Sequence, residues 1–462
     1  MYCAIPIEIA RRELEGQIYL ALHLAARGTP TLLGERGDVE QLCFSRQGDF
    51  VFLDKGLAYY REEFYKELVK RGGKIVELQA EGLAYVAPGF NPKDWGQLGP
   101  IEPYFDALFV WGQKQKPRAQ ARLSEAKREQ VFVTGHPAFD LLLPQFQPYY
   151  FAQELTQKYG EDFILFNSNF GCRYTAVSFN EYKEYVNTGS SLYSEEKYEY
   201  FQQQCVFEEQ YVTKVKELAF ALASISPNRK IVYRPHPVEN VQLLVDEFAA
   251  HSNVIVTNEG GVRSWIASAS MVIQKDCTTG LEALMMGTPV ISFQPLEPVV
   301  ESAYGILATS TKEVLSTIEA IDAGGWSEEK RLDLLQNAAP ILENITKSAA
   351  ATITQWIMET YAPNGAGEEA RPNAISFKRR IRRVLSRIKR ACIATMRPKS
   401  ETAVLWRLRK IKFPHGTLTP EKISSIINRM RDVQPELPQV DIIEVDTDTV
   451  FIFPREIDAV QK

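Results

Sequence analysis

The chain has 462 residues, of which 45% are hydrophobic and 24% charged, and its formal net charge is −5. This length predicts two or three domains, and the composition excludes a disordered or fibrous protein. No apolar run reaches the roughly 18 residues that span a membrane, and the charged first sixteen residues are not typical of a signal peptide. The six cysteines are scattered without a close pair, which favours neither a zinc site nor a disulfide framework and predicts a reduced, cytoplasmic setting.

Short apolar runs alternate with helical patterns along the first 145 residues. Residues 2–9 form the first expected strand, and Leu14, Ile18 and Leu22 then recur at helical spacing, with Gly28 as a C-terminal cap. Further strands are expected within residues 29–34, 49–54, 73–78, 107–112 and 130–135. Continuous apolar runs interleaved with helices predict a parallel sheet that is covered on both faces.

The same pattern restarts after an aromatic segment near residue 148. Strands are expected within residues 162–169, 230–237, 253–260, 270–276 and 288–295, with a long helix over residues 198–226 and helices between 311 and 361. The fold class is therefore α/β, with two successive Rossmann-like domains facing a cleft. The predicted bounds are 1–148 and 149–362, followed by a linker, a basic amphipathic helix and a small α+β extension over residues 363–462.

Two proline-fixed side chains follow the expected strand at residues 230–234. In Arg234-Pro235-His236-Pro237 the prolines hold the backbone extended. Since ligands of open α/β sheets bind at the carboxyl ends of strands, Arg234 and His236 are candidates to contact a phosphate. The alternative is a structural Arg-His pair that caps the next helix.

A second polar turn, residues 276–280 (DCTTG), separates an expected strand from a helical pattern. The helix start favours an anion, and the hydroxyls of Thr278 and Thr279 add donors. Gly280 would let a ligand approach closely, and Glu282, expected in the first turn, would accept hydrogen bonds from ribose hydroxyls. The alternative is that Thr278 or Thr279 is an ordinary N-cap and that Glu282 only favours the helix dipole.

The order of these motifs resembles a known family. Arg-Pro-His-Pro, a strand-helix-strand unit, Thr-Thr-Gly-Leu-Glu-Ala and Gly-Thr-Pro-Val-Ile are similar to the C-terminal half of GT-B-type glycosyltransferases, especially bacterial surface carbohydrate biosynthesis proteins. Those proteins are similar to CDP-glycerol glycerophosphotransferases and capsular Kdo transferases. The resemblance covers roughly residues 1–360 and includes Pro6-Ile7-Glu8, Arg12-Glu13-Leu14, Glu81-Gly82-Leu83, Val133-Thr134-Gly135-His136-Pro137, Phe139-Asp140 and Asn167-Ser168-Asn169-Phe170.

The resemblance implies an N-terminal acceptor domain, a C-terminal nucleotide-donor domain and transfer that needs no metal or other cofactor. Fixed cations and helix N-termini would stabilise the nucleotide leaving group. A carboxylate of the first domain would deprotonate the acceptor, with Glu8 as the first candidate and Glu81 as the second. Glu8 could instead cap or salt-bridge the following helix.

Three further polar residues belong to the expected donor site. Asn167, Ser168 and Asn169 end the first strand of the second domain and are candidates to bind donor phosphate or sugar, although Asn-rich turns are also common without a ligand. His136 is expected to be structural. In the family pattern His-Asn-Ser precedes Thr-Thr-Gly, whereas this chain has Lys275-Asp276-Cys277. The departure removes a histidine and places an acidic residue near the proposed phosphate site.

Positive charge is concentrated near the C-terminus. Residues 378–412 contain 14 Lys or Arg and one acid, Glu401, so of the total charge of −5 this leaves −18 for the rest of the chain. Apolar residues recur near helical spacing, which is typical of an interfacial helix, and residues 377–412 are expected to bind an anionic membrane surface at the inner face of the cytoplasmic membrane. A soluble basic helix is the alternative, and no motif accompanies a nucleic-acid role.

The expected function is a nucleotide-sugar-dependent glycosyltransferase of surface polysaccharide biosynthesis that acts on a glycan or lipid-linked acceptor. Three alternatives remain open. They are a CDP-alditol glycerol- or ribitol-phosphate transferase in which a histidine is the base, an enzyme similar to UDP-sugar 2-epimerases, and a scaffold without catalysis. The donor sugar, the acceptor and the stereochemical outcome do not follow from the sequence.

Overall fold

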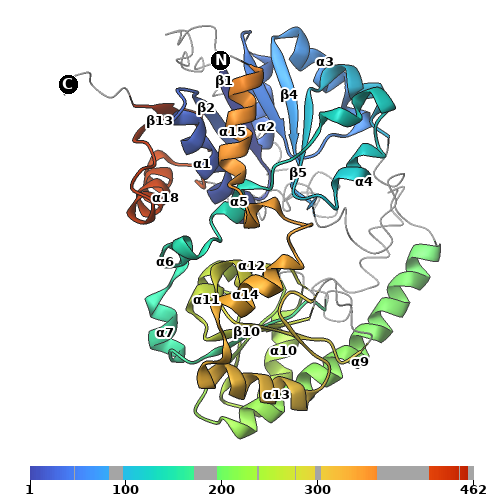
Figure 1. The fold of residues 1–462 in the computed structure, drawn as a ribbon, viewed down its shortest axis with the longest axis vertical. Helices are drawn as coiled ribbons and strands as arrows, with labels where there is room; N and C mark the ends of the chain where they lie inside the picture. The colour runs from blue at the N-terminus through green and yellow to red at the C-terminus, as the bar shows by residue number, and fades with distance from the viewer. Residues whose placement is uncertain are drawn as a thin grey trace, which may run out of the picture. The chain divides into compact units, whose positions relative to one another are not determined.

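The computed structural model describes residues 1–45, 47–82, 97–170, 195–236, 239–275, 277–296, 303–361, 416–446 and 448–455. The chain divides into two compact units: unit 1 is Met1–Leu141 with Ala339–Lys462, and unit 2 is Leu142–Ala338. Each unit contains one sheet with helices packed on it (Figure 1). The predicted α/β class with two Rossmann-like units is confirmed, while the cleft between them stays a prediction.

Unit 1 is built on eight strands in the order β13-β14-β2-β1-β3-β4-β5-β6. Strands β1 to β6 are parallel, β14 is antiparallel to β2, and β13 is antiparallel to β14. Their bounds are β1 Tyr2–Ile7, β2 Thr31–Glu35, β3 Phe50–Asp54, β4 Gly73–Leu78, β5 Ala107–Val110, β6 Val131–Val133, β13 Val440–Asp446 and β14 Thr449–Pro454. Every strand expected before residue 136 is confirmed.

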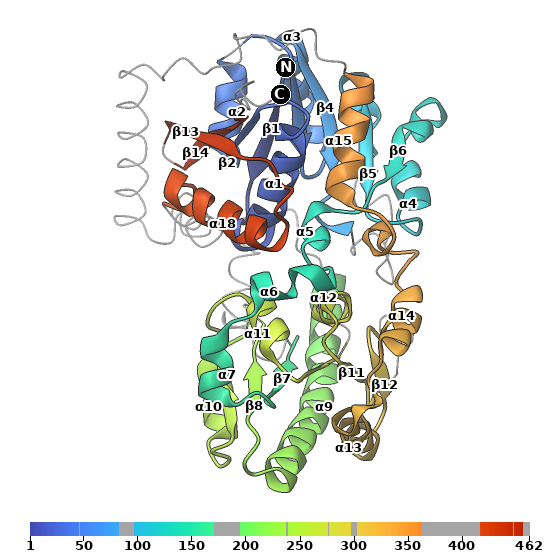
Figure 2. The same cartoon turned by 60° about the vertical axis from the view of Figure 1, so that its left-hand side comes forward.

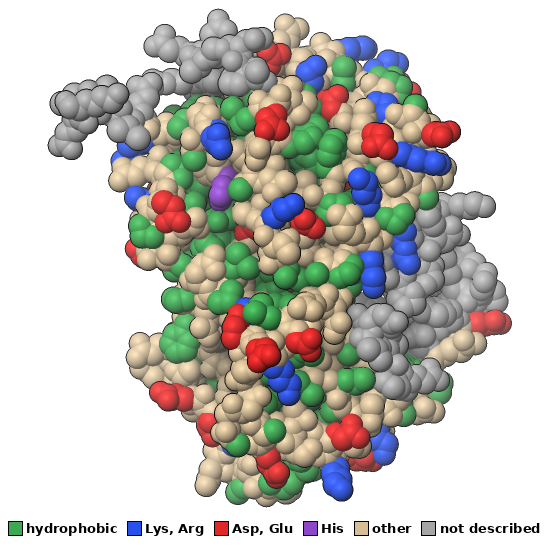
Figure 3. All heavy atoms as spheres, viewed as in Figure 1, with side chains coloured by type: hydrophobic (Ala, Val, Ile, Leu, Met, Phe, Trp, Pro, Cys, Tyr) green, Lys and Arg blue, Asp and Glu red, His purple; other side chains and the backbone are tan. Residues whose placement is uncertain are grey.

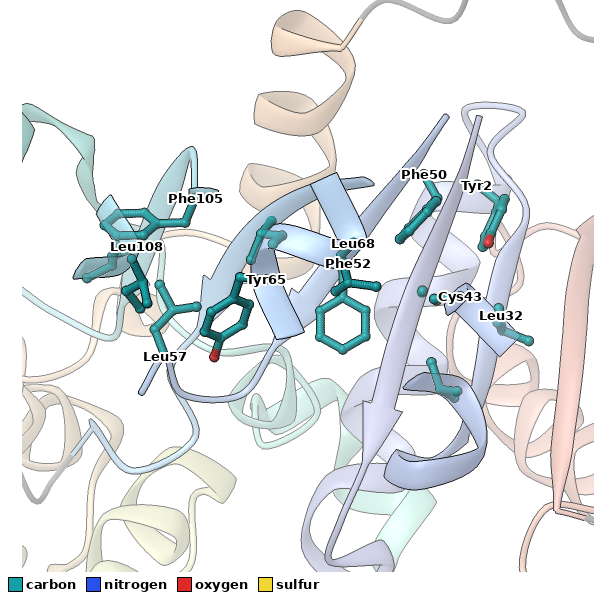
Figure 4. Packing of buried hydrophobic residues seen from close by; sticks show 14 of the residues in the cluster. Tyr2, Leu32, Cys43, Phe50, Phe52, Leu57, Tyr65, Leu68, Phe105 and Leu108 are labelled. Carbon is teal, nitrogen blue, oxygen red and sulfur yellow. The ribbon is translucent and has the colours of Figure 1, made fainter. Parts of the chain in front are cut away.

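Both faces of this sheet are covered, which explains its unbroken apolar strands. On one face Tyr2, Phe50 and Phe52 pack with residues of α2 and α3 in a single core (Figure 4). On the other face Trp356 of α15 packs edge-on against Phe109 of β5, with ring centroids 5.1 Å apart.

The helices of unit 1 include the one expected from the spacing of Leu14, Ile18 and Leu22. It ends at Ala25, and Gly28 adopts a φ of +79° in the turn that follows. The helix bounds are α1 Ala10–Ala25, α2 Arg36–Phe44, α3 Glu62–Lys70, α4 Lys116–Gln120, α5 Pro137–Asp140, α15 Ala349–Thr360 and α18 Pro420–Val433, with 3₁₀ turns η1 Tyr59–Arg61, η3 Gly99–Tyr104, η4 Glu125–Gln130 and η8 Glu343–Ile345.

Unit 2 is built on six parallel strands in the order β12-β11-β10-β7-β8-β9. Helices α9, α10 and α13 share one core with the strands, and α12 packs with α11 and α14. The strands are β7 Ile164–Asn167, β8 Ile231–Arg234, β9 Val254–Val256, β10 Met271–Gln274, β11 Val290–Phe293 and β12 Ile306–Ala308. The helices are η5 Pro144–Phe146, α6 Gln147–Tyr150, α7 Gln153–Tyr159, α9 Glu195–Ile225, α10 Val241–Phe248, α11 Val262–Ser268, α12 Thr278–Met286, α13 Thr311–Ala320, η7 Ile321–Gly325 and α14 Glu328–Gln336.

The end of unit 2 differs from the predicted bound at residue 362. Helix α15 packs on α1 and α5 and so belongs to unit 1. The cause is the buried carboxylate of Asp140, which accepts hydrogen bonds from the backbone N–H groups of Ala349 (2.9 Å) and Ala350 (2.8 Å). The first boundary likewise lies at Leu142 instead of residue 149.

The described C-terminal residues are part of unit 1 and not a separate extension. The predicted short helix and hairpin are confirmed as α18 and β13–β14, and the hairpin continues the sheet at β2 (Figure 2). Gly34 permits this pairing, because a Cβ atom there would lie 2.7 Å from the side chain of Thr449. Residues 416–446 and 448–455 are thus distant in sequence from the first strands of unit 1 but belong to the same unit.

Among the residues described, no helix combines the length and the apolar character that a membrane crossing requires. The linker at residues 363–373, the basic segment at residues 377–412 and Asp276 lie outside the described residues.

Candidate functional site

The sheet of unit 2 has a topological switch point between β7 and β10. The chain leaves β7 toward β8 and β9 on one side and then builds β10, β11 and β12 on the other. In such sheets the connections diverge at this point, and a ligand binds outside the carboxyl ends of the strands. The residues expected to bind the donor lie at the ends of β7 and β8, in the turns that follow these strands, and in α12, which follows β10.

Asn167, the last residue of β7, is the side chain at this point that most clearly lacks partners. It is 4% exposed, and neither its amide nitrogen nor its amide oxygen has a hydrogen-bond partner among the described residues. A buried polar group without a partner is costly, on the order of 1–3 kcal/mol. At the switch point of unit 2, the Asn167 amide thus offers one hydrogen-bond donor group and one hydrogen-bond acceptor to a polar ligand or water.

The start of α12 lies on the other side of the switch point. Cys277 is the N-cap, and its side chain makes no capping bond among the described residues. Thr278 and Thr279 are the first two helical residues, so the alternative in which one of them is the N-cap is wrong. The Thr279 hydroxyl oxygen is buried and has no hydrogen-bond partner in the described part of the chain. The helix start can therefore accept an anion as the sequence predicts.

A close packing contact within unit 2 accounts for the glycine at position 280. A Cβ atom at this position would lie 2.7 Å from the Gln274 amide nitrogen and 2.8 Å from the carbonyl oxygen of Tyr304. The glycine therefore lets α12 pack against the end of β10 and a neighbouring backbone. Close approach of a ligand at Gly280 stays a prediction.

Glu282 already has a partner. Its carboxylate forms an ion pair with Arg263 of α11 at 3.0 Å, and Arg263 also donates to the hydroxyl of Tyr150 at 3.1 Å. Glu282 lies just beyond the first turn of α12, contrary to the prediction. A ribose contact by Glu282 stays a prediction.

Arg234 holds the turn after β9. Its two terminal nitrogens donate to the carbonyl oxygens of Glu259 and Gly260, both at 2.7 Å, and its guanidinium carbon lies 5.7 Å from the Trp265 ring centroid. These contacts fit the structural alternative and correct the prediction that the guanidinium is offered to a phosphate. His236 is half-buried, and burial lowers its pKa, which favours the neutral imidazole.

Glu239 is the buried acid that the sequence did not single out. It is 3% exposed, and its carboxylate accepts hydrogen bonds from the Ser168 hydroxyl (2.7 Å), the Phe170 N–H (3.0 Å) and the His236 N–H (3.1 Å). Burial raises its pKa. Glu239 thus connects the turn after β7 to the turn after β8. Ser168 is predicted to bind the donor, but in this structure its hydroxyl donates to Glu239. Asn169 is exposed in the same turn.

The carboxyl edge of unit 1 holds the candidate base Glu8 at its own switch point, between β1 and β3. The Glu8 carboxylate lies 2.6 Å from Lys55 Nζ and 3.4 Å from Arg36 Nη1. Its backbone N–H donates to Glu13 of α1 at 2.8 Å. The alternative is thus half correct: α1 binds the Glu8 backbone, while the carboxylate pairs with cations of other elements.

Glu81 forms an exposed ion pair with Arg12 of α1, and its N–H donates to the Gln79 side chain at 2.8 Å. The first turn of α1 thereby contacts both candidates, Glu8 through Glu13 and Glu81 through Arg12. His136 caps α5 by accepting from the Ala138 N–H at 3.2 Å, which agrees with a structural role.

No protein-family model matches the sequence, and no curated protein matches it. Among solved structures, the chain is similar to MnaA of S. aureus with UDP, at 13% identity and a TM-score of 0.47, over 81% of this chain and all of that one. A structure described as a UDP-N-acetylglucosamine 2-epimerase from Listeria monocytogenes is similar at 14% identity and a TM-score of 0.49, over 79% and 98% of the two chains. The wall teichoic acid polymerase TagF is similar at 11% identity and a TM-score of 0.46, over 78% and 89%.

Proposed function

We propose that this protein is a metal-independent glycosyltransferase of surface polysaccharide biosynthesis, which transfers a sugar from a nucleotide-activated donor to a glycan or lipid-linked acceptor. The supporting observation is the buried amide of Asn167, which has no partner among the described residues and lies at the switch point of unit 2, next to the strand that leads into α12. The amide offers one donor group and one acceptor group to a hydroxyl- and phosphate-bearing ligand. The helix N-terminus favours the negative charge of the nucleotide phosphates.

In this proposal each residue has a separate task. Thr278 and Thr279 contact the donor phosphates at the start of α12, and Asn167 binds the donor from the end of β7. Arg234 acts as a positioning residue, since its nitrogens hold the turn after β9. Glu8 accepts the proton of the acceptor hydroxyl, while Lys55, at 2.6 Å, fixes its carboxylate.

A second candidate reaction is transfer of an alditol phosphate from a CDP-alditol. The observation that favours it is His236, because burial lowers its pKa and so favours the neutral form, which can accept a proton. The nucleotide base of the bound donor would separate this reaction from transfer of a UDP-linked sugar.

The test is a thermal-shift panel of CMP, CDP, UDP and GDP on the full chain and on Asn167→Leu. We expect at least one nucleotide to stabilise the natural chain. Because leucine is close in shape and removes an unpartnered polar group, the variant without ligand should gain about 1 kcal/mol in the free energy of unfolding. Its nucleotide affinity should fall at least about tenfold, or ~1.4 kcal/mol.

Asn337→Leu is the matched control, because Asn337 is exposed in the same unit and lies at the end of α14. It should change neither quantity. If no nucleotide shifts the melting temperature, the donor site is refuted and a scaffold becomes the better explanation. Equal nucleotide shifts in Asn167→Leu and the natural chain would remove Asn167 from the site.

We also propose that the basic segment, residues 377–412, holds the enzyme on an anionic membrane surface. On the face in Figure 3, acidic and basic side chains of the described residues are interspersed. Residues 378–412, by contrast, carry 14 Lys or Arg and a single acid. Such a concentration of charge is what a polybasic membrane contact requires, and co-sedimentation with anionic vesicles measures it.

A further inference from the structure

Two adjacent tyrosines project from the turn after β3. Tyr59 is 50% exposed and Tyr60 is 78% exposed, and their ring centroids lie 5.7 Å apart in an edge-on arrangement. Adjacent exposed aromatic rings form a small apolar patch, and such patches mark binding sites more often than single exposed side chains do. The pair forms most of η1 and lies at the carboxyl edge of the unit 1 sheet.

Two hydrogen bonds between the Leu57 backbone and buried side chains hold the turn that carries the pair. The Leu57 N–H donates to the carboxylate of Glu77 at 2.8 Å, and its carbonyl accepts from Arg122 at 3.2 Å. Glu77 and Arg122 are both buried. Because these buried side chains hold the main chain in place, the tyrosine rings cannot easily move into the protein interior.

Arg61 fixes the other end of the turn. It donates to Asp54 at 2.9 Å and to Glu40 at 2.6 Å, and its guanidinium carbon lies 3.9 Å above the Phe64 ring. The Tyr65 hydroxyl donates to the same Asp54 at 3.0 Å. The two exposed rings therefore stand on a rigid support, which lowers the entropy lost when a ligand binds.

Lys55, at the start of the same turn, belongs to a cluster of polar side chains that suits the binding of a saccharide. Lys55 Nζ lies 2.6 Å from the Glu8 carboxylate and 3.9 Å from Glu13 Oε1. That Glu13 oxygen is buried and accepts no hydrogen bond from the described residues. Tyr59 comes four positions after Lys55, so their Cα atoms are at most ~14 Å apart, a distance that a short oligosaccharide can span.

We propose that Tyr59 and Tyr60 form a stacking platform for an acceptor saccharide at the switch point of unit 1. Because the two rings stand edge-on, the C–H face of a sugar ring packs on the exposed face of one tyrosine, and the partly exposed Glu8 and Lys55 groups bind the sugar hydroxyls. The proposal rests on the proposed function only in identifying this saccharide as the acceptor.

The test is saturation-transfer NMR and calorimetry on the full chain without nucleotide, with cellotetraose, maltotetraose and chitotetraose as probes. We expect transfer to the ring C–H protons of at least one probe at millimolar concentration. The double variant Tyr59→Ala, Tyr60→Ala should weaken that binding at least tenfold, whereas Tyr60→Trp should retain it. Both positions are exposed, so the melting temperature should stay within a few degrees.

Phe151→Ala is the matched control, because Phe151 is 48% exposed and belongs to unit 2. It should leave the saccharide affinity unchanged. Failure of all three probes to bind, or equal binding by the double alanine variant, would overturn the platform. A change of sedimentation in that variant without any saccharide signal would instead assign the pair to a contact between protein copies. Nucleotide binding without saccharide binding refutes the platform and spares the donor site, and the reverse result refutes only the donor site.

Discussion

Glu239 shows how one buried acid organises the turns of the candidate donor site. It accepts hydrogen bonds from the Ser168 hydroxyl and from the N–H groups of Phe170 and His236, so it fixes the turn after β7 and the turn after β8. Burial raises its pKa above the usual 4.5. A group whose pKa is higher in the folded state than in the unfolded state favours folding at low pH, and this contribution is lost as the pH rises.

The Glu239→Gln variant should remove this pH dependence. Its amide oxygen can accept the two N–H bonds that Oε1 receives, while its nitrogen faces the Ser168 hydroxyl, which also accepts. From about pH 4.5 upward, the free energy of unfolding of the natural chain should fall relative to that of the variant. Urea denaturation between pH 4.5 and 8 measures the difference.

Glu239→Ala serves as the disruptive counterpart. It leaves three donors without their acceptor, so it should destabilise the fold by about 2–4 kcal/mol at every pH in this range. A constant difference between Glu239→Gln and the natural chain over the whole range would show that Glu239 does not titrate there.

At the scale of the element, Asp140 attaches α15 to unit 1. Its two oxygens accept from the N–H groups of Ala349 and Ala350 and from the Ser348 hydroxyl, and the Asn344 amide donates to it at 2.5 Å. Because these donors would be left buried and unpaired, Asp140→Ala should lower the free energy of unfolding by about 3 kcal/mol. Chemical denaturation measures this loss, and amide exchange should show that α15 opens first.

The matched control is Glu217→Ala, whose carboxylate is 52% exposed and pairs at 2.9 Å with Lys214, which is 47% exposed. An exposed ion pair contributes little, so this change should cost less than about 1 kcal/mol. If the two variants lose the same stability, the capping of α15 by Asp140 is not what holds the helix.

The elements themselves were largely predictable from the sequence. Buried parallel strands such as β3 and β10 are short apolar runs that end at polar turns, and this local signal requires no knowledge of the fold. The attachment of α15 was not predictable, because it depends on the contact between Asp140 and Ala349, which are 209 residues apart. The pairing of β14 with β2 is a similar long-range contact.

The candidate site was predictable in position but not in the task of each side chain. The rule for switch points located Asn167 and the start of α12. It could not reveal that Arg234 binds the backbone at Glu259 or that Gly280 packs against Gln274, because these contacts depend on how the turns and α12 pack in the folded chain. Glu239 has no local pattern that separates it from a surface acid.

At the scale of the whole molecule, the described residues before and after the basic segment belong to the same unit. Before it, the Tyr361 hydroxyl donates to Asp106 at 2.8 Å. After it, the Asp448 carboxylate accepts from the N–H groups of Gly416 and Leu418, both at 3.0 Å. Removal of everything after residue 373 would therefore delete α18 and two strands of the unit 1 sheet together with the positive charge.

A charge-neutralised variant separates these two effects. The 14 Lys and Arg of residues 378–412 are replaced by Gln, while residues 416–455 are kept. Because each basic residue near an anionic surface contributes about 1 kcal/mol, the variant should no longer co-sediment with anionic vesicles at physiological salt. Its melting temperature should stay close to that of the natural chain, whereas truncation after Asn373 should lower it, since unit 1 loses β13 and β14. Neutral vesicles are the lipid control, and vesicle binding that survives neutralisation would place the membrane contact elsewhere on the molecule.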